Sequence, residues 1–198
     1  MIEEAIPLYN QLIDQNPYSA PYWFGLARCH FEDLNFDQAI DACDYALIGD
    51  DEFADAYVMK GHCFYQLGNE DAALECYQKA EQMHGLAPEF VYTYIGLCKV
   101  SKGEWEEGYE NLEKAIQANE AEETPAPTLP SLYANAGLCL SKMKKKRKAH
   151  QYCKKAQKLE PKDPEAYLIE GRMYVEEGDY EKGIKPVSYT HLRVHETK

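Results

Sequence analysis

The chain has 198 residues, enough for one domain with a sizeable core. It carries 21 Lys and Arg against 34 Asp and Glu, a net charge of −13, and 45% of its residues are hydrophobic, the balance of a folded protein. An acidic surface disfavours general binding to nucleic acid or anionic lipid, and the longest apolar stretches fall far short of the ~20 residues of a membrane-spanning helix. We therefore expect neither a nucleic-acid nor a membrane partner.

The cysteines and the first residues indicate a reducing compartment. The seven cysteines are an odd number and contain no CxxC pair. The chain begins with the acidic stretch Met1-Ile2-Glu3-Glu4, which lacks the cationic start of a secretory signal. This pattern predicts free thiols and a cytoplasmic location.

A period of about 34 residues organises the chain from its first helix onwards. Residues 2–17 have the pattern of the second helix of a pair whose first helix is missing, because Ala5 lies 34 residues before Ala39. Each later unit has a small residue near the middle of its first helix, an aromatic residue four positions earlier and another small residue twelve positions later. The central small residues are Ala27, Gly61, Gly96, Gly137 and Gly171.

Each unit is predicted to form two antiparallel helices. In the best-defined unit, residues 55–66 form the first helix, Gly68 and Asn69 the turn, and residues 71–82 the second helix. A lone pair of this kind cannot bury its apolar face, so the pairs must stack into a solenoid. The predicted repeats are 20–53, 54–88, 89–129 and 130–163, followed by a partial repeat over 164–184. An acidic, proline-rich insertion over residues 120–130 is expected to be a long loop between two repeats.

This pattern resembles the tetratricopeptide repeat family from residue 2 to about residue 184. The recurring series Trp/Tyr–Leu–Gly–Tyr–Ala–Phe/Tyr–Ala–Pro carries the resemblance, with Pro17 and Pro161 closing two units. Asp51, Gly85 and Glu120 replace that proline elsewhere, which affects loop stiffness and not the fold. The resemblance implies an all-α fold, a right-handed superhelix of antiparallel helix pairs.

The last residues depart from the repeat. Asp179 to Ile184 begin a second helix, and Pro186 then interrupts it. Residues 186–193 look like the translation of a transposase adapter used in sequencing libraries. We expect 185–198 to be a cloning or assembly artefact, a native tail being the alternative, and the chain to be a fragment.

No pattern in the sequence predicts catalysis or metal binding. Phosphate-binding Gly-Lys-Ser/Thr loops, GxSxG and HExxH are all missing, so we expect no enzyme activity and no cofactor. The neighbours Cys29-His30 and His62-Cys63 would point about 100° apart on a helix and chelate poorly. Cysteine also recurs two residues after the central small residue in four units, which predicts a buried packing role.

The strongest local anomaly is a basic run. Residues 142–158 contain nine Lys and Arg and no Asp or Glu, which leaves 12 basic against 34 acidic residues elsewhere, a net charge of −22. The run replaces the glycine-containing turn of its unit. Its first part forms a candidate basic patch: Lys142, Lys144, Lys145, Lys146, Arg147 and Lys148. The patch is expected either to bind an acidic partner or phosphates, or to be a solvated edge attracted to acidic neighbours, which we favour.

The resemblance also implies where a partner binds. In this family the first helix of each unit lines the concave groove. Mapped by register, the groove positions are Phe24, Arg28, Phe31, Val58, His62, Tyr65, Leu97, Leu138, Leu168 and Arg172. The Lys/Asn and Lys/Arg pairs with which the family's carboxylate-clamp members grip acidic chaperone tails have no counterparts here, which disfavours that role.

The function expected from this resemblance is protein–protein interaction. The chain would be a monomeric scaffold or adaptor that binds a peptide or a partner helix in the groove, with Phe24, Phe31 and Tyr65 as anchors. Two alternatives remain open. The chain is the regulatory repeat region of a larger enzyme or sensor, or it self-associates through uncovered terminal helices.

Overall fold

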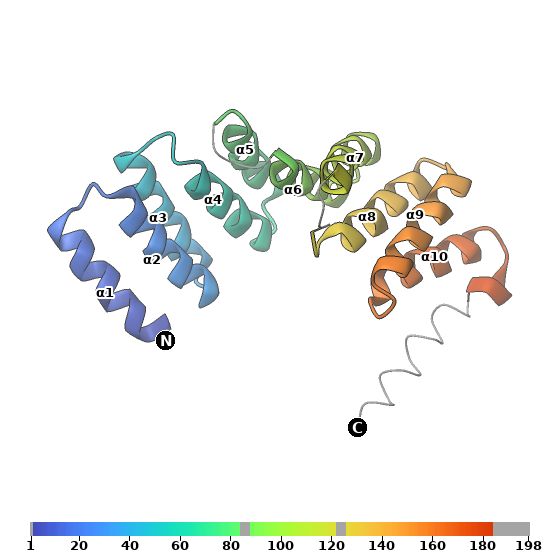
Figure 1. Ribbon diagram of the computed structural model, residues 1–198, viewed down its shortest axis with the longest axis horizontal. Coiled ribbons are helices and arrows are strands. Elements are labelled where there is room, and N and C mark those ends of the chain that lie inside the picture. The colour runs from blue at the N-terminus through green and yellow to red at the C-terminus, as the bar shows by residue number, and fades with distance from the viewer. Residues whose placement is uncertain (1, 84–87, 122–125, 184–198) are drawn as a thin grey trace, which may run out of the picture. The chain divides into compact units, whose positions relative to one another are not determined.

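The computed structural model describes residues 2–83, 88–121 and 126–183, and within them every regular element is a helix (Figure 1). The helices are α1 (Ile2–Gln15), α2 (Ala20–Glu32), α3 (Phe36–Gly49), α4 (Ala54–Gln66), α5 (Glu70–Glu81), α6 (Pro88–Ser101), α7 (Trp105–Ala121), α8 (Leu129–Lys142), α9 (Lys146–Leu159) and α10 (Pro164–Glu176). A further helical turn covers residues 180–183. Helices α4 and α5 lie within one residue of the predicted pair at each end, which confirms that prediction.

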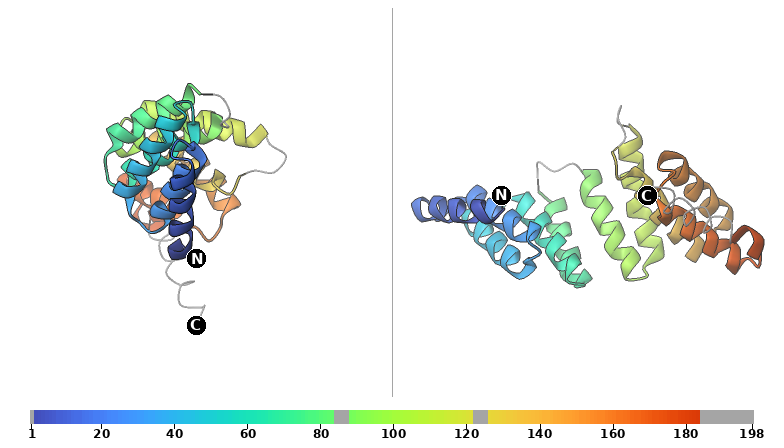
Figure 2. Two further views of the ribbon diagram at one scale, coloured as in Figure 1. Left: turned by 90° about the vertical axis from the view of Figure 1, so that its left-hand side faces the viewer. Right: turned by 90° about the horizontal axis from the view of Figure 1, so that it is seen from below.

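The chain divides into two compact units, Met1–Cys98 and Lys99–Lys198. In the first unit each helix packs on the next from α1 through α5, so the helices lie side by side in antiparallel order (Figure 2). In the second unit α7 packs on α8 and α8 on α9, while α10 contacts both α8 and α9. This is the helix-pair solenoid arrangement predicted from the repeat.

Small residues bring the two helices of a pair into close contact. A Cβ atom on Gly61 would lie 2.6 Å from Cε1 of the buried Tyr77 ring on the partner helix. A Cβ atom on Gly137 would lie 3.0 Å from Sγ of Cys153. The equivalent Ala27 is completely buried. The recurring small residue is therefore a packing requirement, because a larger side chain would push the helices apart.

The turn within each pair repeats one hydrogen-bonded geometry. Leu34 N–H donates to the Phe31 carbonyl and Asn35 N–H to the His30 carbonyl, at 3.0 and 2.8 Å, the two bonds of a Schellman motif. The residue at this turn position has a left-handed backbone in every pair. Gly68, Gly103 and Gly178 adopt it readily, whereas Leu34 (φ 59°) and Lys144 (φ 62°) adopt it at a steric cost.

The proline-rich insertion forms a shorter connection than predicted. Helix α7 continues through Glu120 to Ala121, and α8 begins at Leu129 with Pro130 in its first turn. The expected loop was therefore too long at its start, because good helix-forming residues extend α7 through Glu120 and Ala121. Pro130 lies near the start of the next helix, as expected, because proline is tolerated in the first turn. Residues 122–125 and the predicted artefact over 185–198 lie outside the described residues.

All seven cysteines are buried free thiols. This confirms the packing role that the repeat predicted for Cys29, Cys63, Cys98 and Cys139. The described helices include none that is both long and apolar enough to cross a bilayer.

Replacing Leu34 by glycine is expected to stabilise the protein by about 0.5–1 kcal/mol. Leu34 is 73% exposed, so little packing is lost, and glycine removes the penalty of a left-handed backbone, partly offset by its own chain entropy. Urea unfolding measures the change. Gly68→Ala at the equivalent turn is the control and should destabilise by about 1 kcal/mol. A Leu34→Gly protein less stable than wild type would contradict the explanation.

Candidate functional site

The first helices of the pairs in the first unit present aromatic and apolar side chains on one face. On α2, Phe24, Arg28 and Phe31 follow the i, i+4, i+7 spacing of a single helical face. The Phe24 ring packs edge-to-face on Phe53, with centroids 5.3 Å apart, and Phe31 packs on Phe36 at 5.5 Å. Both phenylalanines are half-buried, whereas Arg28 is exposed. This face combines anchored rings with an accessible cation.

His62 on α4 lies at the centre of an aromatic cluster formed with Phe31, Tyr77, Phe90 and Tyr94. Its ring centroid lies 4.2 Å from that of Tyr94, 5.6 Å from Tyr77, 6.1 Å from Phe90 and 6.3 Å from Phe31. These rings come from α2, α4, α5 and α6, so within the first unit the cluster connects helices of three successive repeats. Phe90 remains 42% exposed and gives the cluster an accessible edge.

His62 is held in its neutral form. Its Nδ1 atom lies 2.7 Å from the Tyr77 hydroxyl oxygen. Burial lowers the pKa of His62 to about 4, because the apolar surroundings disfavour the imidazolium ion. Burial likewise raises the pKa of Tyr77, whose hydroxyl therefore keeps its proton. His62 serves this face as a packed, hydrogen-bonded ring and not as a positive charge.

The structure places the other predicted groove positions in different environments. Val58 is only 6% exposed and packs with Ala73, Tyr77 and Val91, so it offers little area to a partner. Tyr65 and Leu97 are half-buried, as is Leu138 in the second unit. On α10, Leu168 and Arg172 are exposed and line a shallow hollow of about 420 Å³ with Val175 and Glu176.

Phe90 and Tyr94 were missed by the mapping from the repeat. They occupy positions that the register assigns to Pro21 and Gly25 in an earlier repeat, so periodicity alone gave no reason to select them. Their spacing with Leu97, at i, i+4 and i+7, was the available signal, since it places all three on one face of α6.

The basic patch extends from Lys142, the last residue of α8, through the turn into the start of α9 in the second unit. Lys144 holds the left-handed turn position, and Lys145 precedes the first residue of α9. Lys142 and Lys146 lie 3.6 Å from carboxylate oxygens of Glu176 and Glu177. Part of the patch is thus attracted to nearby acidic residues, in line with the solvated-edge interpretation.

Lys148 on α9 contacts α7 mainly through the side chain of Tyr109. Its ammonium group donates to the Tyr109 hydroxyl, lies 3.8 Å from Glu113 and sits 4.9 Å from the centre of the Tyr109 ring. The hydrogen bond with Tyr109 raises the pKa of Lys148. The Tyr152 hydroxyl, on the same face of α9, donates to Glu113 at 2.6 Å.

Lys155 repeats this arrangement about two turns further along α9. Its ammonium group donates to the Tyr133 hydroxyl at 2.9 Å and to Glu120 at 3.3 Å, and it lies 4.6 Å from the Tyr133 ring centre. The Tyr133 hydroxyl in turn donates to Glu120 and, with Lys155, lowers the pKa of that carboxyl. The ammonium groups of Lys148 and Lys155 are thus already paired with tyrosine and glutamate side chains of the second unit.

The cysteines have the environment of packing residues. Burial raises the pKa of Cys63, Cys139 and Cys153 to about 12, far above that of a reactive thiol. Within the described ranges, no group of three or more His, Cys, Asp and Glu side chains is arranged to hold a metal ion.

Comparisons with known proteins identify the repeat. Three family models described as tetratricopeptide repeat match residues 2–52, 54–84 and 130–163. A curated relative, small glutamine-rich tetratricopeptide repeat-containing protein 2 of Mycosarcoma maydis, is 33% identical over 79 residues, which make up 40% of this chain and 22% of that protein. The chain therefore matches about a fifth of this relative's length.

Solved structures share the architecture. YrrB, described as a TPR protein with an unusual peptide-binding site, superposes with a TM-score of 0.73 at 18% identity, over 92% of this chain and 90% of that chain. MamA from Desulfovibrio magneticus RS-1 superposes with a TM-score of 0.78 at 13% identity, over 90% of this chain and 97% of that chain. At these identities the likeness concerns the fold.

Lowering the pH from 7 to 5 is expected to cost about 2 kcal/mol of stability through His62. In the unfolded chain His62 takes up a proton with its ordinary pKa of 6.5, whereas in the folded protein it does so near 4. The unfolded state therefore binds more protons between these values, and the contribution of neutral His62 is lost as the pH falls through this range. Urea unfolding at both pH values measures the free energy of unfolding. In His62→Phe the decrease of this free energy between pH 7 and 5 should be smaller by the same amount, about 2 kcal/mol. An unchanged loss in the variant would refute the assignment.

The native protein should react with an aromatic disulfide reagent at pH 8 at least about a hundredfold more slowly than the unfolded chain, because its thiols are buried and burial raises the pKa of thiols such as Cys63. The absorbance of the released thiolate follows the reaction. A fast phase of one or more equivalents in the native state would show that a cysteine is reactive.

Proposed function

The chain belongs to the tetratricopeptide repeat family, a fold that supports protein–protein interaction, and from this premise we propose that it is a non-catalytic scaffold whose first unit binds a peptide. The peptide lies across the first-helix face of α2, α4 and α6. The observation that carries the proposal is the series of rings on this face, from Phe24 and Phe31 to the partly exposed Phe90.

Aromatic side chains of this kind are suited to hold a partner. Their rings are fixed by contacts with neighbouring rings, so little conformational entropy is lost when a ligand covers them. Half-buried rings also offer apolar area against which an apolar side chain of a peptide packs. YrrB, which shares the fold, is described as having a peptide-binding site, and this supports the use of such a scaffold for peptides.

Charge indicates which peptides fit the first unit. Residues 1–98 carry 17 Asp and Glu against three Lys and Arg. Such a unit repels acidic segments and attracts basic ones, although Arg28 supplies a local cation on the face. The proposed ligand is an extended or helical peptide with apolar anchors and neutral or basic flanks.

Replacing Phe24 and Tyr65 together by alanine is expected to weaken peptide binding by more than about tenfold without loss of helicity, because two anchor rings are removed from the face. The probe is a twelve-residue peptide selected from a random phage-displayed library against the wild-type protein, and fluorescence anisotropy measures its affinity. Circular dichroism monitors the fold.

Tyr18→Ala/Tyr180→Ala is the matched control. It removes two tyrosines that are 74% and 64% exposed and lie outside the first-helix face, so binding should persist. Equal weakening in both variants, or a library that yields no binding peptide, would overturn the proposal.

A further inference from the structure

Helix α9 carries two basic stripes with different surroundings. Lys148, Tyr152 and Lys155 form one of them, which we call the paired stripe, and its lysines contact Tyr109, Tyr133, Glu113 and Glu120. Arg147, Gln151, Lys154 and Lys158 form the other, the outward stripe. Their spacing of four, three and four residues places them on a single face, about 100° around the helix from the paired stripe.

The cations of the outward stripe form no ion pair with the described residues of the chain. All four of its residues are exposed. Within residues 2–83, 88–121 and 126–183, no carboxylate lies within 4 Å of Arg147, Lys154 or Lys158. Lys144 and Lys145, just before the helix, are also exposed and lack such a partner in the same ranges. Five cations thus remain unneutralised at this end and along this face of α9, although the chain as a whole is acidic.

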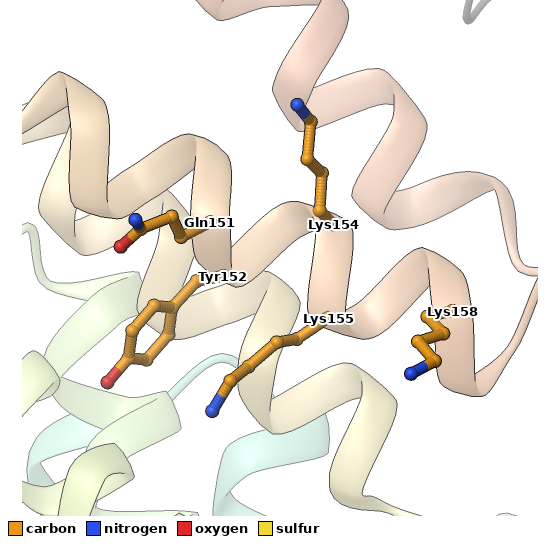
Figure 3. Close-up of a pocket in the computed structure, with 5 residues that line it drawn as sticks. All are labelled: Gln151, Tyr152, Lys154, Lys155 and Lys158. Carbon is orange, nitrogen blue, oxygen red and sulfur yellow. The ribbon is translucent and has the colours of Figure 1, made fainter.

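A shallow hollow of about 490 Å³ accompanies the outward stripe. Gln151, Tyr152, Lys154, Lys155 and Lys158 line it. In Figure 3, Tyr152 and Lys155 extend to the same side of the helix, while Lys154 points away from them. Tyr152 is only 8% exposed, so the apolar contact area beside the charges comes from the aliphatic parts of Lys154 and Lys158.

We propose that the outward stripe binds a short Asp- and Glu-rich peptide segment of a partner protein. At 1.5 Å per residue, the stripe from Arg147 to Lys158 is about 16 Å long. If the acidic peptide is helical, side chains three or four residues apart reach successive cations over this length. If it is extended, side chains two residues apart do so. The aliphatic parts of Lys154 and Lys158 contact the stems of the glutamate side chains.

The short length of the stripe favours a peptide over a nucleic acid. A polyanion longer than about 16 Å would extend past the stripe to a chain whose remaining charge is strongly negative. A short acidic segment stays within the local positive field. This surface shares no residue with the first-helix face of the first unit. Residues 1–98 carry a net negative charge and suit ligands of the opposite charge.

The test compares two double variants on the same helix. Arg147→Gln/Lys154→Gln removes two cations of the outward stripe, and Lys148→Gln/Lys155→Gln removes two of the paired stripe with the same seven-residue spacing. Both lower the net charge by two, so any effect of total charge is equal. The probe is a fluorescein-labelled decaglutamate peptide, whose binding is followed by anisotropy at 50 and 200 mM NaCl.

The outward-stripe variant should bind decaglutamate about tenfold more weakly than wild type with an unchanged Tm, because each lost contact contributes modestly and no internal contact is broken. The paired-stripe variant should bind within twofold of wild type and show a lower Tm. Wild-type binding should weaken at 200 mM NaCl.

Three results would overturn the proposal. One is the absence of decaglutamate binding to the wild-type protein at 50 mM NaCl. Another is equal weakening in the two double variants, which would indicate a diffuse charge effect. The third is tighter binding of a ten-residue oligodeoxythymidine than of decaglutamate, which would assign the stripe to nucleic acid.

Discussion

The close approach of two helices at small residues is the constraint on which the rest of this structure depends. Neither helix of a pair can bury its apolar face alone, and the faces meet only where the intervening side chain is small. At Gly61 the room left by the missing side chain is filled by the ring of Tyr77, which is completely buried. The Tyr77 hydroxyl then bonds to His62 on the first-helix face. A packing requirement inside one pair thereby fixes the centre of the aromatic cluster.

The same constraint applies to the inner positions of each second helix and not to its outer positions. The inner positions of the second helices must be small or apolar, as Ala149, Cys153 and Ala156 are in α9. The outer positions carry no such requirement and are free to hold charge. In α9 they hold lysine and arginine, whereas the neighbouring α7 carries the glutamates that face the paired stripe. One repeat architecture therefore supports an acidic, aromatic-faced first unit and a basic stripe in the second.

Burial and charge contribute unequally to the fold. Fully burying a large side chain such as Leu112 or Tyr133 stabilises a protein by about 2 kcal/mol, whereas an exposed ion pair contributes less than about 1 kcal/mol. Lys148 and Lys155 combine ion pairing with stacking on tyrosine rings. Their contacts therefore contribute more to stability than a simple surface ion pair does. The unpaired cations of the outward stripe add nothing to stability, and their charge is available for binding.

Sequence alone determined the repeat, the helix pairs, the turn at Gly68 and the burial of the four cysteines that recur with the repeat, because each follows from residue size and helical spacing within about 34 residues. It also assigned Phe24, Phe31 and His62 to the first helices of their pairs, where the structure has them. Only the tertiary structure decided that Val58 is buried, that His62 is neutral and surrounded by rings, and that Phe90 and Tyr94 complete the cluster. It alone divided the basic run of α9 into paired and unpaired lysines. These outcomes depend on contacts between residues 13 to 39 positions apart, such as Tyr133 with Glu120 and Lys148 with Tyr109, which no local pattern encodes.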